Sequence, residues 1–537
     1  EEQAFRYIYD KYYGYLCAIA KGYLSDNDAA ETVVGDVIYN IWEIRKNLNI
    51  HTSLRSYLIR SVKNRSINYW IHSAICVAFI FGFGLLEPFG SLEKLGMQVL
   101  GIFIGLLYGW TFIGFIWPSL VGLLALGFTD YGAMGVVLAE GFGNIQVTIL
   151  VLFVFILAAY LNKIGLSSYI ANWFISRKFT IGKPWLFSLM ILLVAYILGA
   201  TVSLTASIVL IWSIFYNICD VVGFKKGDKY PTIMLVAIVF SAMLGFAVFP
   251  FKALQLLMLG SLENVSGLTV DFFDFTVFTF FITAASLLAF MVVFRFLLRP
   301  DVTPLTTDTD HFAHLRGQKL DRDQKIGAFF LVFFIFAMFA PSLLPKASLL
   351  GKIFTRLGTT GSLILVVTLI AVVKIQGKPI MDFGEAARGI NWDIVIMFVA
   401  TMPVAHAMSS PDTGVMTFIV EILEPIFQGM SPDLFIIVFV LVGGIVTQVA
   451  HNLVLGALLT PIAYSFSVTL GVNPLLTVTL LAVAIATPGG SAPGALIYVN
   501  REWIDVASAY KYTAIIVVLN LVVMLIVGIP LGHIIFR

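Results

Sequence analysis

Charged residues are scarce in this chain of 537 amino acids, where lysine, arginine, aspartate and glutamate together make up only 12%. A soluble globular domain carries about 25% charged residues, so this composition excludes a soluble protein for most of the length. Hydrophobic residues reach 59%, and the mean hydropathy is +0.95. Apolar stretches of about 20 residues recur and do not alternate with polar positions, which favours membrane-spanning helices over a β-barrel.

Cysteine is also rare, and Cys17, Cys76 and Cys219 lie far apart. An odd number at such spacing indicates neither a disulfide framework nor a metal site. The sequence contains no nucleotide-binding glycine loop, no metal-ligand cluster and no nucleophile motif, so we do not expect an enzyme. The polar opening "EEQAF" has neither a methionine nor a signal-peptide core, and we expect the natural start to be missing or altered.

Residues 1–70 differ in composition from everything that follows. The stretches "SDNDAAETVVGDVIYNIWEIRKNL" and "SLRSYLIRSVKNRSINYW" place apolar residues at helical spacing. Each leaves polar or basic residues on its other faces. These patterns predict a small soluble helical domain ahead of a first membrane span that begins at Ile71.

The pattern that starts at "AFRYIYDKYYGYL" resembles region 2 of the extracytoplasmic-function sigma factors, which are bacterial promoter-recognition subunits. The resemblance implies that a helix at Asp36–Trp42 faces RNA polymerase. It also implies that Lys63, Asn64 and Arg65 meet promoter DNA. The second DNA-binding region of that family has no counterpart, because membrane spans follow directly. Two alternatives to a working sigma module therefore stay open: a helical appendage with a solvated basic face, and an accidental or engineered gene fusion.

The membrane part is predicted to consist of two halves. The polar stretch "RPDVTPLTTDTDHFAHLRGQKLDRDQK" separates a first repeat at 71–298 from a second repeat at 325–537, with a linker at 299–324. Basic residues in this linker, and others just before the first span, predict that both the linker and the N-terminal segment are cytoplasmic.

Corresponding segments of the two halves resemble each other. The segment "EGFGNIQVTILVLFVFILAAYLNKIGL" matches "RGINWDIVIMFVATMPVAHAMSSPDTGV". Each half then carries an apolar run that glycine and proline interrupt, namely "SAMLGFAVFPFKALQ" and "ATPGGSAPGALIYVN". In lipid, unwound backbone is tolerated only where it is buried in protein or lines a cavity, and its free N–H and C=O groups suit ions. We therefore predict a duplicated transporter with a site at two broken helices; the alternative is two kinks that only shape packing.

The segments "ATPGGSAPGALIYVN", "INWDIVIMF" and "GIPLGHIIF" resemble the divalent-anion:sodium symporter family, whose members carry dicarboxylates, citrate and sulfate. The resemblance covers residues 71–537. It implies an all-α polytopic membrane protein with two inverted repeats, re-entrant helical hairpins and broken helices. It further implies a homodimer in the bacterial inner membrane that works by elevator-type alternating access.

Matching the family's two Ser-Asn-Thr signatures to this chain predicts the site. Ser203-Leu204-Thr205 occupies the first signature and His451-Asn452-Leu453 the second, so one asparagine is lost in the first half. The resemblance implies substrate-binding residues and, with some overlap, cation-binding residues. The substrate set is Ser203, Thr205, Lys252, His451, Asn452, Thr487 and Pro488, and the cation set is Gly245, Asn452, Thr487 and Gly489.

Lys252 falls where the family would hold its first sodium ion. Its ammonium group could replace that cation, because ionisable residues within membranes usually serve function; alternatively, Lys252 snorkels to the interface. His451 could titrate and couple transport to protons, or it is a hydrogen-bonded structural residue. Glu140 and Asp393 flank spans and are predicted to lie at the membrane interface, while His406 is predicted to serve packing or a hydrogen-bond network.

The leading hypothesis is secondary active transport of a di- or tricarboxylate, coupled to Na⁺ or H⁺ and without a bound cofactor. One alternative is a permease for an inorganic anion or arsenite. The other is a membrane-tethered signalling protein, in which the transporter-like part senses a solute and the sigma-like segment acts on polymerase.

Overall fold

The computed structural model describes residues 2–24, 30–31, 33–35, 37–38, 41, 53–306, 319–375, 378–427, 429–488, 492–500 and 503–536. Over these residues the protein is helical, apart from a short antiparallel pairing of β1 (Lys374–Ile375) with β2 (Lys378–Pro379). Among them, 11 helices are long and apolar enough to cross a membrane, or up to 13 if two bent pairs each count as one span. The predicted class, an all-α polytopic membrane protein, is confirmed.

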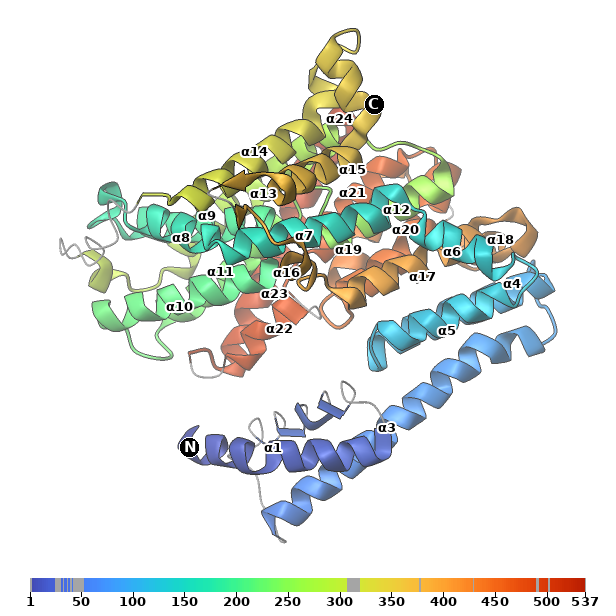
Figure 1. Cartoon of the computed structure of the whole chain (residues 1–537), viewed down its shortest axis with the longest axis horizontal. Helices are drawn as coiled ribbons and strands as arrows, with labels where there is room; N and C mark the ends of the chain where they lie inside the picture. The colour runs from blue at the N-terminus through green and yellow to red at the C-terminus, as the bar shows by residue number, and fades with distance from the viewer. Residues whose placement is uncertain are drawn as a thin grey trace.

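The N-terminal part consists of α1 (Glu2–Leu24) packed against α3 (Leu54–Gly82), and Figure 1 shows both projecting from one side of the helical bundle. Ser53 caps α3 by accepting a hydrogen bond from the Ser56 N–H at 3.2 Å. The helix then continues through Ile71, so the segment predicted to be soluble and the first membrane span share one unbroken helix. The predicted helix at Asp36–Trp42 lies largely outside the described residues.

The first half of the membrane part follows α3 and is built from ten α-helices. A π-helical turn, η2 (Ile145–Ile149), leads into the fourth of them, and a second one, η4 (Val293–Leu298), ends the last. The ten are α4 (Lys94–Phe112), α5 (Ile116–Gly127), α6 (Met134–Phe142), α7 (Leu150–Lys163), α8 (Leu166–Ile175), α9 (Pro184–Thr201), α10 (Leu204–Val222), α11 (Lys229–Phe246), α12 (Ala253–Ser266) and α13 (Phe272–Val292).

The second half has the same order of elements as the first: a helical hairpin, then a broken helix, then a closing span. Its last span is bent through a π-helical turn, η8 (Met524–Gly528). Its helices are α14 (Arg322–Leu343), α15 (Leu349–Val372), α16 (Phe383–Ala387), α17 (Trp392–Ser409), α18 (Val415–Phe427), α19 (Pro432–Val446), α20 (Asn452–Thr469), α21 (Pro474–Ile485), α22 (Ala492–Val499), α23 (Val506–Val523) and α24 (Ile529–Ile535).

Each half carries a helix break where the sequence predicts one. The first break separates α11 from α12 and contains Pro250; the second follows α21 and contains Pro488. Proline has no backbone N–H to continue the helical ladder, which explains why both helices stop there. The hairpin that precedes each break is α9–α10 in the first half and α19–α20 in the second.

The matching segments of the two halves run in opposite directions. Gly389, just before α17, approaches the end of α7 so closely that a Cβ there would lie 2.5 Å from the Ala159 Cβ. Near the other end of both helices, Asn144 donates to the Asn264 side-chain oxygen at 3.3 Å, and the Asn264 amide contacts the Met402 Sδ at 3.2 Å. The segment that leads into α7 therefore lies near the second half of α17, so the two helices run in opposite directions.

Candidate functional site

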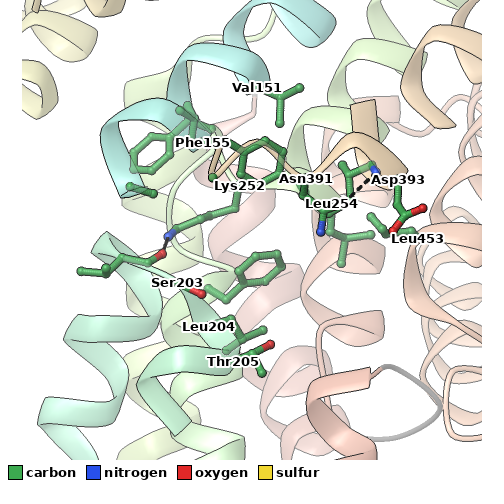
Figure 2. Close-up of a pocket in the computed structure, with 18 of the residues that line it drawn as sticks. Val151, Phe155, Ser203, Leu204, Thr205, Lys252, Leu254, Asn391, Asp393 and Leu453 are labelled. Carbon is green, nitrogen blue, oxygen red and sulfur yellow. Dashed lines mark hydrogen bonds between the residues drawn. The ribbon is translucent and has the colours of Figure 1, made fainter. Parts of the chain in front are cut away.

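A cavity of about 580 Å³ lies where segments of both halves converge. Its wall comes from α7, the tips of the α9–α10 and α19–α20 hairpins, the first helix break and the start of α17 (Figure 2). Much of this wall is apolar, and a few polar groups project into it, which is typical of a site for a small solute. The polar lining residues are Asn162, Ser203, Thr205, Lys252, Asn391, Asp393, His451 and Asn452.

Helix N-termini from both halves face this cavity. Ser203, Lys252, Asn391 and His451 all line it, and they are the N-cap residues of α10, α12, α17 and α20 respectively. The first backbone N–H groups of a helix have no partner within the helix, and the helix dipole adds about half a positive charge at that end. The cavity is therefore positively polarised by backbone alone, which suits an anion.

Lys252 adds a side-chain amino group to this arrangement. Its Nζ donates a hydrogen bond to the Val202 carbonyl oxygen at 2.7 Å, and the residue is only 6% exposed. Val202 lies between α9 and α10, so the amino group is placed at the tip of the first hairpin (Figure 2). A buried side chain held in this way does not extend to the membrane surface, as the snorkelling alternative requires.

Ser203 and Thr205 stand beside this contact, at the beginning of α10. The Ser203 side chain makes no capping hydrogen bond to the helix that it precedes, and Thr205 is exposed on the cavity side of the hairpin tip. Figure 2 shows both residues on the same stretch of chain as Leu204, below Lys252. The structure thus brings the three predicted first-half substrate residues together.

The tip of the second hairpin contributes His451 and Asn452. Both side chains accept from the Leu453 N–H, the His451 Nδ1 at 3.3 Å and the Asn452 side-chain oxygen at 2.9 Å. The His451 ring also packs edge-on against Phe115, with the ring centroids 5.3 Å apart. Because its Nδ1 accepts a hydrogen bond, that nitrogen carries no proton, and the imidazole is neutral in this arrangement.

Thr487 and Pro488, the other predicted substrate residues, do not line the cavity. Both are buried at the second break. The Thr487 hydroxyl donates to the Ala484 carbonyl at 3.0 Å and accepts from the Gln448 side chain at 3.3 Å. Thr487 is therefore tied to the second hairpin through Gln448 and does not face the cavity.

Gly245 and Gly489 are the remaining residues of the predicted cation set, and Gly245 is not among the residues that line the cavity. Gly245 is inside α11, where its carbonyl accepts from the Val248 N–H at 3.0 Å. A Cβ at this position would lie 1.9 Å from the Tyr196 carbonyl oxygen, so glycine permits close contact between α9 and α11. Gly489 lies outside the described residues.

The sequence reasoning missed Asn391 and Asp393 as members of the site. Asn391 caps α17 by accepting from the Ile394 N–H at 3.2 Å, and Asp393 lines the cavity instead of only marking a membrane interface. The sequence did contain a sign of both residues, because "INWDIVIMF" places two polar side chains at the start of an apolar span. What the sequence could not show is that this helix start meets the two hairpin tips.

Glu140 and His406 form a separate cluster with Tyr131. The Tyr131 hydroxyl contacts Glu140 at 2.7 Å and the His406 Nδ1 at 2.8 Å, and the two partners are 3.2 Å apart. This cluster joins α6 to α17, in line with the predicted network role of His406. The half-buried Glu140 is part of that network.

A second cavity of about 500 Å³ adjoins the first and shares Ala159 and Gly389 with it. Its charged lining includes an ion pair between Lys163 at the end of α7 and Glu385 in α16. Asp323, in the first turn of α14, also lines it, so this vestibule lies on the side of the linker between the two halves. The two cavities therefore meet at Ala159 and Gly389.

The architecture is that of a polytopic membrane protein with a solute-sized cavity between inverted repeats. A solved structure of similar fold is the YdaH transporter of Alcanivorax borkumensis, with a TM-score of 0.51 and 12% identity over 76% of this chain and 90% of that one. A likeness at that identity concerns the fold alone.

Residues 73–486 match the family model described as citrate transporter, and the chain belongs to this family. Residues 8–72 match the model for sigma-70 region 2.

Among curated proteins, the chain is similar to the sodium-dependent dicarboxylate transporter SdcS of Staphylococcus aureus. For strains USA300 and NCTC 8325 the identity is 27% over 171 residues, which cover 29% of this chain and 32% of the relative. The match therefore spans about a third of the length of these relatives. The family and the relatives are named as transporters rather than enzymes, as the sequence predicts.

Proposed function

We propose that this protein is a secondary active transporter of small anions with two or three carboxylates. The observation that carries the proposal is the convergence of four helix N-termini and the Lys252 amino group on one cavity. Membership of the citrate transporter family and the similarity to a dicarboxylate transporter support the choice of substrate.

In this proposal the first-half groups hold the substrate's negative charge. The N-termini of α10 and α12 offer backbone N–H groups that Ser203 and Lys252 do not cap with their side chains. Such groups bind carboxylates well, because the donors are prealigned and the helix dipole favours an anion. The Ser203 and Thr205 hydroxyls are placed to bind a second carboxylate oxygen or a substrate hydroxyl.

Lys252 takes the place of one coupling cation in the proposed cycle. Its amino group donates a hydrogen bond to the Val202 carbonyl oxygen at the hairpin tip. A sodium ion would use a carbonyl oxygen of this kind as a ligand. We propose that coupling uses fewer Na⁺ ions than the two-site pattern of the family resemblance, with Asn452 in the remaining cation site. H⁺ is the alternative coupling ion, and Asp393 is then a carboxylate of the cavity that could carry the proton.

The proposed mechanism is elevator-type alternating access in a homodimer of the bacterial inner membrane. The hairpin tips would carry the substrate past α7 and α17, and the vestibule beside Ala159 and Gly389 would be the cytoplasmic exit. The N-terminal segment would then be cytoplasmic too, on the same side as the linker. The inverted orientation of α7 and α17 supports such a cycle, because exchanging the conformations of two inverted repeats opens the opposite face.

The test is uptake of radiolabelled succinate and citrate into proteoliposomes, for the wild type and Lys252→Asn. Each is assayed with an inward Na⁺ gradient, with a proton gradient and with neither. We expect wild-type uptake of at least one acid, and a greater dependence on Na⁺ in Lys252→Asn, because the variant vacates a cation position and restores an amide. Lys163→Asn, which removes a lysine from the vestibule, is the matched control.

Two results would count against the proposal. Failure of both acids to enter under every gradient rejects the substrate class and directs the search to inorganic anions or arsenite. Uptake that is unchanged by Lys252→Asn in rate and in ion dependence rejects the role of the lysine, while the transport assignment stands.

A further inference from the structure

Aromatic side chains mark the level at which α3 enters the bundle. The Tyr69 hydroxyl accepts from the Trp117 Nε1 at 3.0 Å, and the Trp70 Nε1 donates to the Tyr23 carbonyl at the end of α1 at 2.9 Å. Tyrosine and tryptophan gather where hydrocarbon meets headgroups, because one end of each ring system is apolar and the other is polar. Because α3 continues from here into a candidate membrane span, we place the membrane–water interface at the turn around residue 70.

One face of α3 changes from basic to apolar as it approaches this level. Arg60, Lys63, Ile67 and Trp70 follow the spacing of a single helical face, and all four are exposed. Trp70 is 55% exposed and Ile67 is 42% exposed, so both are accessible on this face. We call these four residues the α3 face.

The unbroken helix sets the distance from the basic residues to the headgroups. Seven residues separate Lys63 from Trp70, which is about 10 Å along a helix axis. The headgroup layer on each side of a bilayer is about 5–8 Å thick, and the Debye length at physiological salt is about 8 Å. Lys63 and Arg60 thus lie within reach of lipid phosphates, because their side chains are long and can extend toward the layer.

We propose that the α3 face binds the anionic lipid headgroups of the bilayer into which α3 runs. Ile67 and Trp70 would insert among the upper acyl chains and headgroups, and Arg60 and Lys63 would pair with lipid phosphates, as juxtamembrane basic segments do. Lys63 is also the residue that the sigma-factor resemblance places on promoter DNA. A DNA duplex would have to enter the headgroup layer to contact it there, against repulsion from the same anionic lipids. The geometry thus favours lipid over nucleic acid.

The experiment uses the full chain in lipid nanodiscs of two compositions, phosphatidylcholine alone and phosphatidylcholine with phosphatidylglycerol. A nitroxide label is placed at Asn64→Cys, in a Cys17→Ser background because Cys76 and Cys219 are buried. Relaxation by a nickel-chelating lipid reports how near the label lies to the headgroups. Pairing of Arg60 and Lys63 with phosphatidylglycerol should tilt α3 so that this face approaches the headgroups. We therefore expect stronger relaxation with phosphatidylglycerol, and we expect added salt to remove the difference.

A pair of charge reversals then tests which residues are responsible. Lys63→Glu should abolish the effect of phosphatidylglycerol. Lys11→Glu, an equal charge change at an exposed residue of α1, should leave that effect intact. Equal relaxation in both lipid mixtures overturns the proposal. So does an equal loss in both variants, or loss of the headgroup contact on addition of RNA polymerase core enzyme. Because no substrate is involved, the result is independent of the proposed transport activity.

Discussion

The two halves present their helix ends to the same cavity in different chemical forms. In the first half, Ser203 and Lys252 precede α10 and α12 without capping them. In the second half, Asn391 and His451 accept backbone N–H groups of α17 and α20. A capped terminus has fewer free donors for a ligand. We infer that the first half holds the substrate's charge, while the second half completes the wall.

The two helix breaks also differ in what they present to the cavity. The first break carries Lys252 into the cavity, whereas Thr487 and Pro488 at the second break are buried. Close to them, the Thr447 hydroxyl donates to the Ile485 carbonyl at 3.2 Å, and the Gln448 side chain donates to the Thr487 hydroxyl. The two halves thus share a topology, while the residues at equivalent places make different contacts. The difference teaches that internal symmetry predicts where a site lies and leaves open which half carries its charge.

Replacing the cavity lysine should have the largest effect. Lys252→Met removes the amino group that we propose to bind the substrate's carboxylate, and a hydrogen bond to a charged group contributes ~1.5–3 kcal/mol. At 1.4 kcal/mol per tenfold change, uptake should fall by between one and two orders of magnitude. The measurement is initial uptake rate in proteoliposomes at equal protein content. Lys163→Met in the vestibule serves as control, and an equally large loss there would contradict the special role of Lys252.

Adding a side-chain cap to the N-terminus of α10 should have the next largest effect. Ser203→Asp introduces a good N-cap that binds the free N–H groups of α10 and repels an anion. We expect the KM for the transported acid to rise about tenfold, from ~1.4 kcal/mol of lost binding, with the protein still folded. The neutral cap in Ser203→Asn should raise KM less. An unchanged KM in Ser203→Asp would place the anion elsewhere in the cavity.

The second break should respond in stability rather than in binding. Thr487→Val removes a buried hydroxyl that bridges Ala484 and Gln448, and the loss is expected to be about 1–2 kcal/mol of unfolding free energy. The KM should stay the same, because Thr487 does not line the cavity. Thermal unfolding in detergent and uptake kinetics measure the two quantities. Thr205→Val, on the cavity wall, should show the opposite pattern of a raised KM with little change in stability.

The smallest effect is expected at the capped second hairpin. His451→Asn keeps a side chain that can cap α20, because asparagine is among the best N-cap residues. KM should change by no more than about twofold, which is ~0.4 kcal/mol, and the dependence of uptake on pH should be the same as in the wild type. A pH profile that flattens in the variant would instead identify His451 as the group that carries a coupled proton.

Particular residues show how far the sequence could lead to this site. Lys252 stood out because an ionisable residue is conspicuous in an apolar run, and the hairpin residues from Ser203 to Thr205 were located by resemblance. Asp393 was placed at the interface, since a polar residue at the start of a span is expected there, and Asn391 was given no role. Thr487 was predicted at the site, yet its hydroxyl is used within the second break.

By itself, the sequence determined the membrane class, the similarity between segments of the two halves and the positions of both helix breaks. These properties depend on composition, on internal similarity and on proline, all of which act locally along the chain. Only the tertiary structure decided which helix ends meet, which of them are capped and that α3 runs unbroken through residue 70. Those features depend on packing between segments hundreds of residues apart, where one hydrogen bond from Lys252 to Val202 distinguishes two repeats that share a topology.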